Sequence, residues 1–339
     1  MSTSTPLVSI GLPVYNGENY LADAIKSHLG QTLTDFELVI SDNGSTDATE
    51  AICRRFAAQD SRIRYYRSDV NRGIRWNLPR VFELARGTYF RWAAHDDLVA
   101  PTMLEACLDV LEKDPSVALC MPKTLVIDDE SRIVRFPEGH FTSGCVGEDD
   151  ESHRLRLLAS DRPAERFRGV LLMSLRCHEI FGLARREQMA GTGLYRGYNG
   201  SEKVFLAELA LIGRYVELDE PLFYNRWHDE RASANRRATG QNQVVDPRKS
   251  KRLAAPHEIR TGLGYLSLIP SADVSLWERV RCLGVFGRFA LRLDRWQHII
   301  NKLITGKSNT ALVEPELERG ERVSVPQVLA QDEAPAGSD

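Results

Sequence analysis

Residues 89–97 read YFRWAAHDD, an apolar, strand-like run that ends in an acidic pair, Asp96 and Asp97. An earlier strand-like run, 36–40, is followed by the acidic turn 41–47, SDNGSTD. Carboxylates that follow strands lie at the C-terminal edge of an open α/β sheet, where such sheets bind ligands. Two such strand ends brought together can hold a hydrated divalent cation and the diphosphate that it neutralises. The pattern therefore predicts a nucleotide substrate and group-transfer chemistry.

Strand-like and helix-like segments alternate over the first third of the chain. Strands are predicted at 7–13, 36–40, 63–66 and 89–94, and apolar residues recur at helical spacing between them. This alternation predicts an α/β fold with a mainly parallel central sheet, flanked by helices and joined by right-handed crossovers.

Composition narrows the class of protein. The chain has 339 residues and a net charge of -3, so no basic field suggests a nucleic-acid partner. Six cysteines occur without CxxC pairs, which predicts neither a thiolate metal site nor a disulfide framework. Residues 1–6 lack the features of a secretory signal. We therefore expect a cytoplasmic location, and a position at the inner face of the membrane is the alternative.

Three motifs carry a resemblance to a known family. Residues 8–16 (VSIGLPVYN), 41–47 (SDNGSTD) and 95–97 (HDD), in this order and at these separations, resemble family 2 glycosyltransferases with the GT-A fold. The resemblance covers roughly residues 7–230. It implies a GT-A, Rossmann-like sheet, a nucleoside-diphosphate sugar donor, Mn²⁺ or Mg²⁺, and inversion at the anomeric carbon. The expected enzyme is a hexosyltransferase-type glycosyltransferase of EC 2.4.

The resemblance also suggests a division of the chain. Residues 1–235 would form the catalytic domain, with a nucleotide-sugar half to about 125 and an acceptor half beyond it. Residues 236–310 would be a linker and an amphipathic helical extension, and 311–339 a disordered tail. In the middle of the chain, polar residues 138–166 predict a long loop, whereas 117–121, 124–127, 215–218 and 221–224 predict separate short strands.

Donor-binding residues follow from the motifs residue by residue. Tyr15 matches an aromatic position that can stack on the base, and the carbonyl of Pro13 would face that base. Asp42 and Asn43 stand where the family often has two aspartates. Because Asn43 can donate as well as accept, a uracil base is only weakly favoured. A core tyrosine and a simple Asn-Gly turn are the structural alternatives.

The diphosphate and metal residues follow in the same way. The stretch from Asn71 to Asn77 resembles a segment beside the nucleotide, in which Arg72 would pair with phosphate and Asn77 would also contact the donor. Asp97 matches the metal ligand, and Asp96 the position that meets the ribose or the metal shell. His228, after the strand 221–224, would approach the metal or the diphosphate. Surface residues and a solvated acidic turn are the alternatives.

The acceptor side depends on two residues. Glu202 precedes an apolar helix and matches the acidic position of the catalytic base, which takes the proton of the acceptor hydroxyl. The alternative for Glu202 is an acidic residue that only complements the helix dipole. His178 lies in a segment that resembles the acceptor-lining part of the family, and a structural histidine is the alternative.

An apolar stripe with arginines runs through 276–304. Basic amphipathic helices that carry tryptophan can lie on anionic membranes, which would suit a lipid-linked acceptor. The other interpretation is that the stripe packs on the catalytic domain or on a second subunit of a homodimer.

Other functions stay open alongside synthesis of a cell-surface glycan, polysaccharide or glycolipid. A sugar nucleotidyltransferase would also join an α/β sheet to metal–nucleotide chemistry, but 13–16 (PVYN) occupy the place of its usual Gly-rich, Lys-containing loop. A non-catalytic nucleotide-sugar-binding protein is the remaining alternative.

Overall fold

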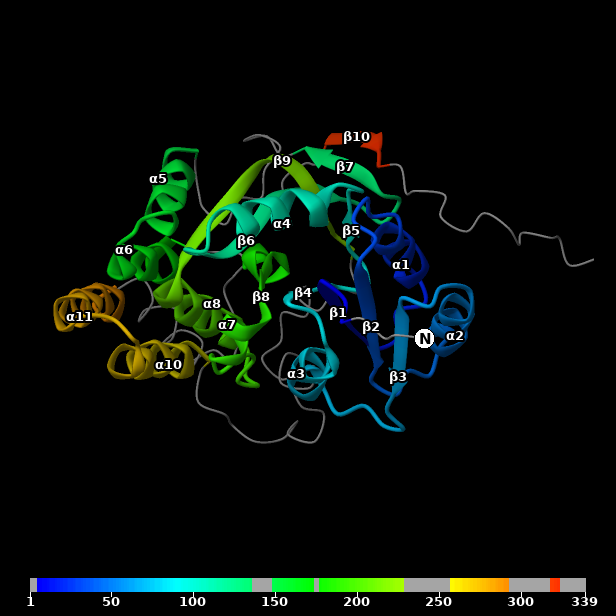
Figure 1. Cartoon of the computed structure of the whole chain (residues 1–339), viewed down its shortest axis with the longest axis horizontal. Coiled ribbons are helices and arrows are strands. Elements are labelled where there is room, and N and C mark those ends of the chain that lie inside the picture. Colours follow the sequence, from blue (N-terminus) through cyan, green and yellow to red (C-terminus); the bar gives the residue numbers. More distant parts are fainter. Residues whose placement is uncertain (1–4, 136–147, 174–176, 229–256, 293–317, 324–339) are drawn as a thin grey trace, which may run out of the picture.

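A computed structural model describes residues 5–135, 148–173, 177–228, 257–292 and 318–323 (Figure 1). Its centre is a mixed sheet flanked by helices, whose strands follow the order β10-β7-β6-β8-β4-β1-β2-β3. The long strand β9 pairs with β6 and β5 beside this path.

The first half of the chain builds a parallel sheet in the order β4-β1-β2-β3. Its elements are β1 (Val8–Val14), α1 (Leu21–Leu29), β2 (Phe36–Asp42), α2 (Thr49–Gln59), β3 (Ile63–Arg67), α3 (Ile74–Leu84) and β4 (Tyr89–Trp92). In the register, Val14 lies beside Asp42 and Gly11 beside Trp92. The loops after β1 and β2 therefore begin level with each other, at one edge of the sheet.

The second half extends the sheet with antiparallel and parallel pairs. Its elements are β5 (Leu98–Val99), α4 (Met103–Lys113), β6 (Val117–Ile127), β7 (Arg132–Arg135), α5 (Glu148–Leu158), α6 (Pro163–Arg168), η1 (Gly169–Met173), η2 (His178–Phe181), β8 (Leu183–Arg185), α7 (Arg186–Ala190), α8 (Ser201–Ile212) and β9 (Arg214–Arg226). Strand β8 lies antiparallel between β4 and β6. Strand β9 runs parallel to β6, and its end pairs antiparallel with β5.

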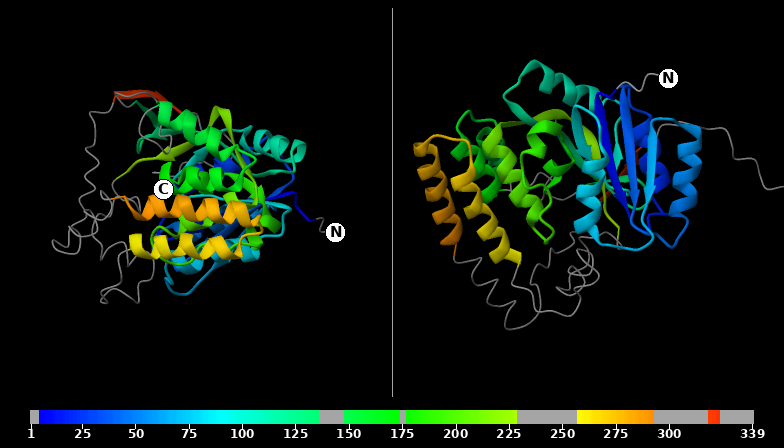
Figure 2. Two further views of the ribbon diagram at one scale, coloured as in Figure 1. Left: turned by 90° about the vertical axis from the view of Figure 1, so that its left-hand side faces the viewer. Right: turned by 60° about the horizontal axis from the view of Figure 1, so that its bottom comes forward.

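Two further helices and a strand follow. Helices α10 (His257–Ser271) and α11 (Leu276–Ala290) lie side by side at the end of the molecule opposite β3 (Figure 2). Helix α10 packs on α8, and α11 packs on α6. Strand β10 (Glu318–Arg322) pairs antiparallel with β7. No helix in the described ranges is both long and apolar enough to cross a membrane.

Trp92, at the end of β4, connects the sheet to α8. Its ring makes edge contacts with Phe90 and with Phe205 of α8, each at 5.2 Å between centroids. Its indole N–H donates to the carbonyl of Leu78 on α3 at 3.1 Å. Because Glu202 lies one turn before Phe205, this contact fixes the start of α8 relative to the turn that follows β4.

The predicted α/β architecture and the helical C-terminal region are confirmed, but several boundaries differ. The paired strands predicted at 117–127 and 215–224 are single strands, because register shifts around Pro122 and Lys123 absorb the prolines without breaking the pairing. The loop predicted at 138–166 contains α5 and the start of α6. The buried Arg154 of α5 is paired with Glu151 and Glu179, so a charged segment packs inside.

The C-terminal predictions are tested only in part. Strand β10 forms within the segment that was predicted to be a disordered tail. The predicted domain boundary at 235, much of the linker and residues 293–304 of the apolar stripe lie outside the described residues. They stay predictions.

Glu217 on β9 makes stability depend on pH. Burial, with a contribution from Glu151, raises the pKa of Glu217 from 4.5 to about 7. Below pH 4.5 the group is protonated in both states, and as pH rises to about 7 the unfolded chain ionises first, so stability falls. We expect Glu217→Gln to stabilise the protein by about 1–3 kcal/mol at pH 8 and much less at pH 5. Urea unfolding at both values measures this.

The control is Asp219→Asn, whose side chain is 98% exposed on the same strand. It should change stability little at either pH. An equal effect of Glu217→Gln at pH 5 and pH 8 would contradict the assignment.

Candidate active site

The turn between β4 and β5 is held by a buried carboxylate. Asp97 is 4% exposed. Its Oδ1 accepts hydrogen bonds from the Asn225 side-chain amide at 3.0 Å and from the backbone N–H of Arg226 at 2.8 Å. Burial and the neighbouring charge of Asp96 raise the pKa of Asp97 well above its usual range. Asp97 therefore ties the end of β9 to this turn.

Arg226 extends the same connection to two other loops. Its Nε donates to the carbonyl of Asp96 at 2.8 Å, and its Nη1 donates to the carbonyl of Asp128 at 2.9 Å. The guanidinium also lies over the ring of Tyr20, 4.7 Å from its centroid. One buried cation thus joins the β4–β5 turn, the β6–β7 turn and the start of α1.

Asp96 and His228 face each other beside this framework. Asp96 Oδ2 lies 3.0 Å from His228 Nε2, and the side chains are 16% and 8% exposed. The ring of Tyr20 packs 4.7 Å from that of His228. Burial opposes ionisation of Asp96, but the hydrogen bond to His228 and the nearby imidazoles lower its pKa on balance. The pair offers a carboxylate and an imidazole at the edge of the sheet.

The assignment of Asp97 as the metal ligand, made from sequence, stays a prediction. Asp97 Oδ1 is already committed to two donors in the interior, whereas Asp96 faces His228. His228, predicted to approach the metal or the diphosphate, lies beside Asp96, and its role stays a prediction.

The loops after β1 and β2 are joined by hydrogen bonds. The backbone N–H of Asn16 donates to Ser45 Oγ at 2.9 Å, and that of Gly17 donates to Thr49 Oγ1 at 2.8 Å. A Cβ on Gly17 would lie 2.7 Å from the His95 ring, so only glycine fits there. Tyr15, at the rim of this double loop, is 42% exposed. Its ring is therefore available for stacking.

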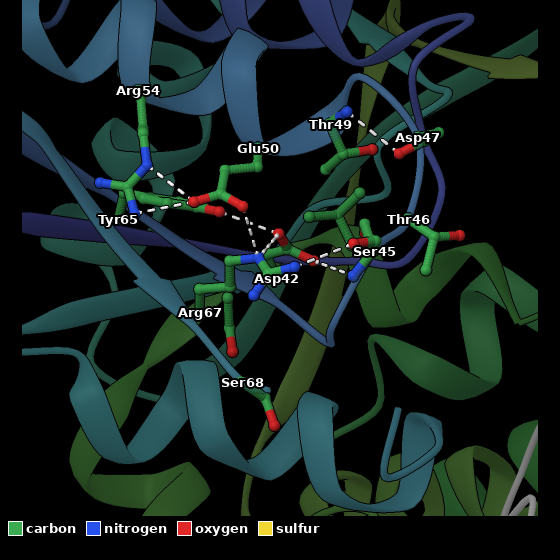
Figure 3. Close-up of polar contacts among 12 residues, drawn as sticks. Asp42, Ser45, Thr46, Asp47, Thr49, Glu50, Arg54, Tyr65, Arg67 and Ser68 are labelled. Atoms are coloured by element: carbon green, nitrogen blue, oxygen red, sulfur yellow. Dashed lines mark hydrogen bonds and ion pairs between the residues drawn. The ribbon is translucent and has the colours of Figure 1, made fainter. Parts of the chain in front are cut away.

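Asp42 lies beneath this double loop rather than on its surface (Figure 3). Its Oδ1 accepts from the Ser45 N–H at 2.8 Å, and its Oδ2 accepts from the Tyr65 hydroxyl at 2.8 Å. Arg67 lies between Asp42 and Glu50, with Nε 3.4 Å from Asp42 Oδ2. With no exposed surface, Asp42 shapes the loop here, and its direct contact with a donor stays a prediction.

The other predicted donor residues are also either buried beneath the loops or exposed at their rim. Asn77 is buried, and its amide donates to the carbonyl of Ser41 at 2.8 Å, which supports the end of β2. Asn43 Oδ1 accepts from the backbone N–H of Arg72 at 3.0 Å. The Arg72 side chain is exposed and lies over Trp76, 4.8 Å from the ring centroid. Pro13 is half-buried beside Ser41.

The acceptor-side residues form a separate group. Glu202 is the second residue of α8, which follows Gly200, and the φ of +89° at Gly200 lets the chain turn into the helix. Burial raises the pKa of Glu202. Burial, with a contribution from the charge of Glu202, raises the pKa of the Cys177 thiol, and Cys177 directly precedes His178. His178 packs against Phe223 of β9 at 6.4 Å between ring centroids, so η2, α8 and β9 converge.

The loop before α8 also reaches the donor half. Gly197, with φ of +73°, passes so close to Arg75 of α3 that a Cβ would lie 2.4 Å from its side chain. Together with the Trp92–Phe205 contact, this brings the Glu202 segment against both α3 and β4. No hydrogen bond or ion pair in the described residues joins Glu202 to the Asp96–His228 pair directly.

Three residues of the framework were given no role from sequence. Tyr20, Asn225 and Arg226 are adjacent in space only because β9 returns to pair with β5. The one local signal was that Asn225 and Arg226 lie three and two residues before His228, at the end of a strand.

Comparison with known proteins agrees with this arrangement. Residues 9–159 match the family model described as Glycosyl transferase family 2. Over these residues the chain is similar to family 2 glycosyltransferases. Chondroitin synthase of Escherichia coli is 38% identical over 129 residues, which cover 38% of this chain and 19% of that protein. Glycosyltransferase GlyG of Streptococcus pneumoniae is 32% identical over 114 residues, covering 33% and 38%.

Solved structures support the fold of the glycosyltransferase domain. TarS residues 1–349 of S. aureus, in complex with UDP-GlcNAc, superposes with a TM-score of 0.59 at 14% identity. The match covers 88% of this chain and 75% of that one. This likeness confirms a GT-A-like architecture. The chain spans well under half the length of either sequence relative above.

Removing the Asp97 side chain should destabilise the domain. In Asp97→Ala, the Arg226 N–H and the Asn225 amide lose their acceptor in the interior, at a cost of about 1–3 kcal/mol. Asp97→Asn, which keeps an acceptor oxygen, should cost less. Urea unfolding measures both, with Asp129→Ala as an exposed acidic control on the neighbouring turn. If Asp97→Ala and Asp129→Ala unfold at the same urea concentration as the parent, Asp97 does not hold the turn.

Proposed function

We propose that this protein is an inverting, metal-dependent glycosyltransferase that moves a sugar from a nucleoside-diphosphate sugar to a hydroxyl acceptor. One observation carries the proposal: Asp96 and His228 face each other at 3.0 Å, at the edge of the sheet where the donor loops end. The relative named chondroitin synthase agrees with an acceptor that belongs to a polysaccharide or another cell-surface glycan.

The residues present fit a divalent cation that is only partly held by protein. In the described ranges, no group of three or more ligating side chains gathers. Mg²⁺ and similar cations commonly bind through one or two carboxylates, with water and substrate phosphates as the other ligands. Asp96 and His228 supply two such positions, and the cation would neutralise charge on the departing diphosphate.

The donor would be oriented by the double loop and by α3. Tyr15 offers an exposed ring to the base, and Arg72 offers an exposed guanidinium, stacked on Trp76, to the diphosphate. Asp42 and Asn77 act from below by holding the ends of β1 and β2. TarS binds UDP-GlcNAc with a similar fold, which supports a UDP-sugar as the first donor to test.

Glu202 would act as the general base. An in-line displacement requires a carboxylate on the face of the sugar opposite the leaving diphosphate, where it accepts the proton of the acceptor hydroxyl. Burial raises the pKa of Glu202, which makes its carboxylate a stronger base than an exposed one. His178, beside Phe223, would contribute to the acceptor side.

Nucleotide binding tests the donor half. A ligand at about 100 times its dissociation constant stabilises the native state by about 2.7 kcal/mol. We therefore expect one of UDP, GDP, TDP and CDP to raise the melting temperature with Mn²⁺, and UDP to do so first. Asp96→Ala should abolish the Mn²⁺-dependent part, whereas Asp129→Ala should retain it. No shift with any nucleotide would contradict both the proposed donor site and the alternative of a non-catalytic nucleotide-sugar-binding protein.

Loss of the base should affect turnover rather than donor binding. We expect Glu202→Gln to lower kcat by about 10²–10⁴-fold, with the nucleotide-induced melting shift unchanged. In the parent enzyme, activity should fall with decreasing pH at a midpoint above the ordinary range of glutamate, because burial raises this pKa. Glu83→Gln, an exposed glutamate on α3, is the control. Full activity in Glu202→Gln would remove Glu202 from the mechanism.

A further inference from the structure

Helix α11 presents an apolar strip to solvent. Leu276, Trp277, Val280, Leu283 and Leu291 are between 49% and 78% exposed. At about 100° per residue, these positions fall within an arc of about 120° around the helix axis, and so do Gly284 and Gly287. Leu291 is the C-cap residue of the helix. A Cβ on Gly284 or Gly287 would meet nothing within 4 Å, so the strip is open. The opposite side, with Cys282 and Phe289, is buried.

Helix α10 adds a second apolar strip. Ile259, Leu263 and Leu266 recur at helical spacing and are 37%, 62% and 38% exposed. Their neighbours Tyr265 and Leu268 are buried against the rest of the molecule. Because α10 and α11 lie side by side across one end of the molecule (Figure 2), the strips belong to the same end. A patch of this kind marks an interaction surface.

Arginines border the α11 strip along one edge. Arg281, Arg288 and Arg292 follow the strip in the helical projection, and all three are exposed. Between 257 and 292 the chain has five arginines and three acids, Glu258, Asp273 and Glu278. Of these acids, Glu278 is already bonded to Arg281 and to the backbone N–H of Ala164. The face is therefore apolar with a cationic edge.

A groove between α6 and α11 continues this cationic edge. The groove is lined by four arginines, Arg162, Arg168, Arg281 and Arg288, and Glu165 is the acidic residue in its lining. Glu165 is bonded to Arg162 and to Ser160. In the described part of the chain, neither Arg168 nor Arg288 has a hydrogen bond or ion pair to an acid. Two uncompensated guanidinium groups in a groove suit phosphate oxygens.

We propose that the α10–α11 face docks on an anionic phospholipid bilayer, with Trp277 and its neighbours in the interface and the groove arginines on lipid phosphates. Tryptophan, aliphatic side chains and bordering arginines are the composition of helices that lie in the plane of a membrane surface. A second copy of this chain fits less well, because its equivalent face would bring the same arginines and few acids. The inference does not depend on the transfer reaction.

Docking would orient the acceptor half toward the membrane. Helix α10 packs on α8, and the Tyr198 hydroxyl, in the loop before α8, donates to the carbonyl of Arg260 at 3.3 Å. Helix α8, which carries Glu202 in its first turn, is therefore one layer from the docking face. An acceptor carried on a lipid would reach this side of the molecule.

Flotation of the full-length chain with vesicles tests the proposal. We expect binding to phosphatidylcholine vesicles that contain phosphatidylglycerol and little binding to phosphatidylcholine alone. Trp277→Ser with Leu283→Ser should reduce binding at least tenfold. Arg168→Gln and Arg288→Gln should each reduce binding to the anionic vesicles about fivefold. Both classes of substitution alter exposed or half-buried side chains, so unchanged melting temperatures should accompany them.

Matched controls lie elsewhere on the surface. Ile212→Ser replaces another exposed apolar side chain, and Arg55→Gln replaces an exposed arginine on α2. Both should bind vesicles like the parent. The proposal is overturned if the parent binds neither vesicle or if the face variants bind as well as the controls. It is also overturned if sedimentation without lipid shows a dimer that Trp277→Ser with Leu283→Ser converts to monomer while vesicle binding is absent.

Discussion

The hydrogen bonds between Asp97 and the end of β9 are the constraint on which the site depends. A carboxylate that is removed from water must be matched by donors, and Asn225 and the Arg226 N–H supply them. Because β9 crosses from the acceptor half to pair with β5, these two bonds join the halves at the point where the acidic turn leaves the sheet. Asp96 and His228 face each other as a result.

The same principle recurs around the donor loops. Buried polar side chains hold backbone atoms, while the side chains that could meet a ligand stand above them. Asp42 and Asn77 satisfy loop and strand groups from below, and Tyr15 and Arg72 are exposed at the rim. Acidic and amide residues in such a motif can thus shape the loops without an exposed surface of their own.

Sequence patterns predicted the parallel half of the fold well because its strands are short, apolar and separated by helices. They also predicted that the ends of β1, β2 and β4 carry the polar residues of the site. They assigned Asp97 to the metal and could not show that Asp97 bonds to the end of β9 while Asp96 faces His228, because these partners lie about 130 residues away in the chain. The helix α5 was missed because Arg154 is charged, and its buried partner Glu179 lies 25 residues away.

The central proposal is that Asp96 and His228 hold the cation of a bound nucleotide, while Asp97 holds the turn. The most direct measurement is a crystal structure with Mn²⁺ and the nucleoside diphosphate that stabilises the protein most, with Mn²⁺ located by its anomalous scattering. The account predicts a peak within coordination distance of an Asp96 oxygen and of His228 Nε2, while Asp97 keeps its bonds to Asn225 and Arg226. A peak coordinated by Asp97 instead would contradict the account.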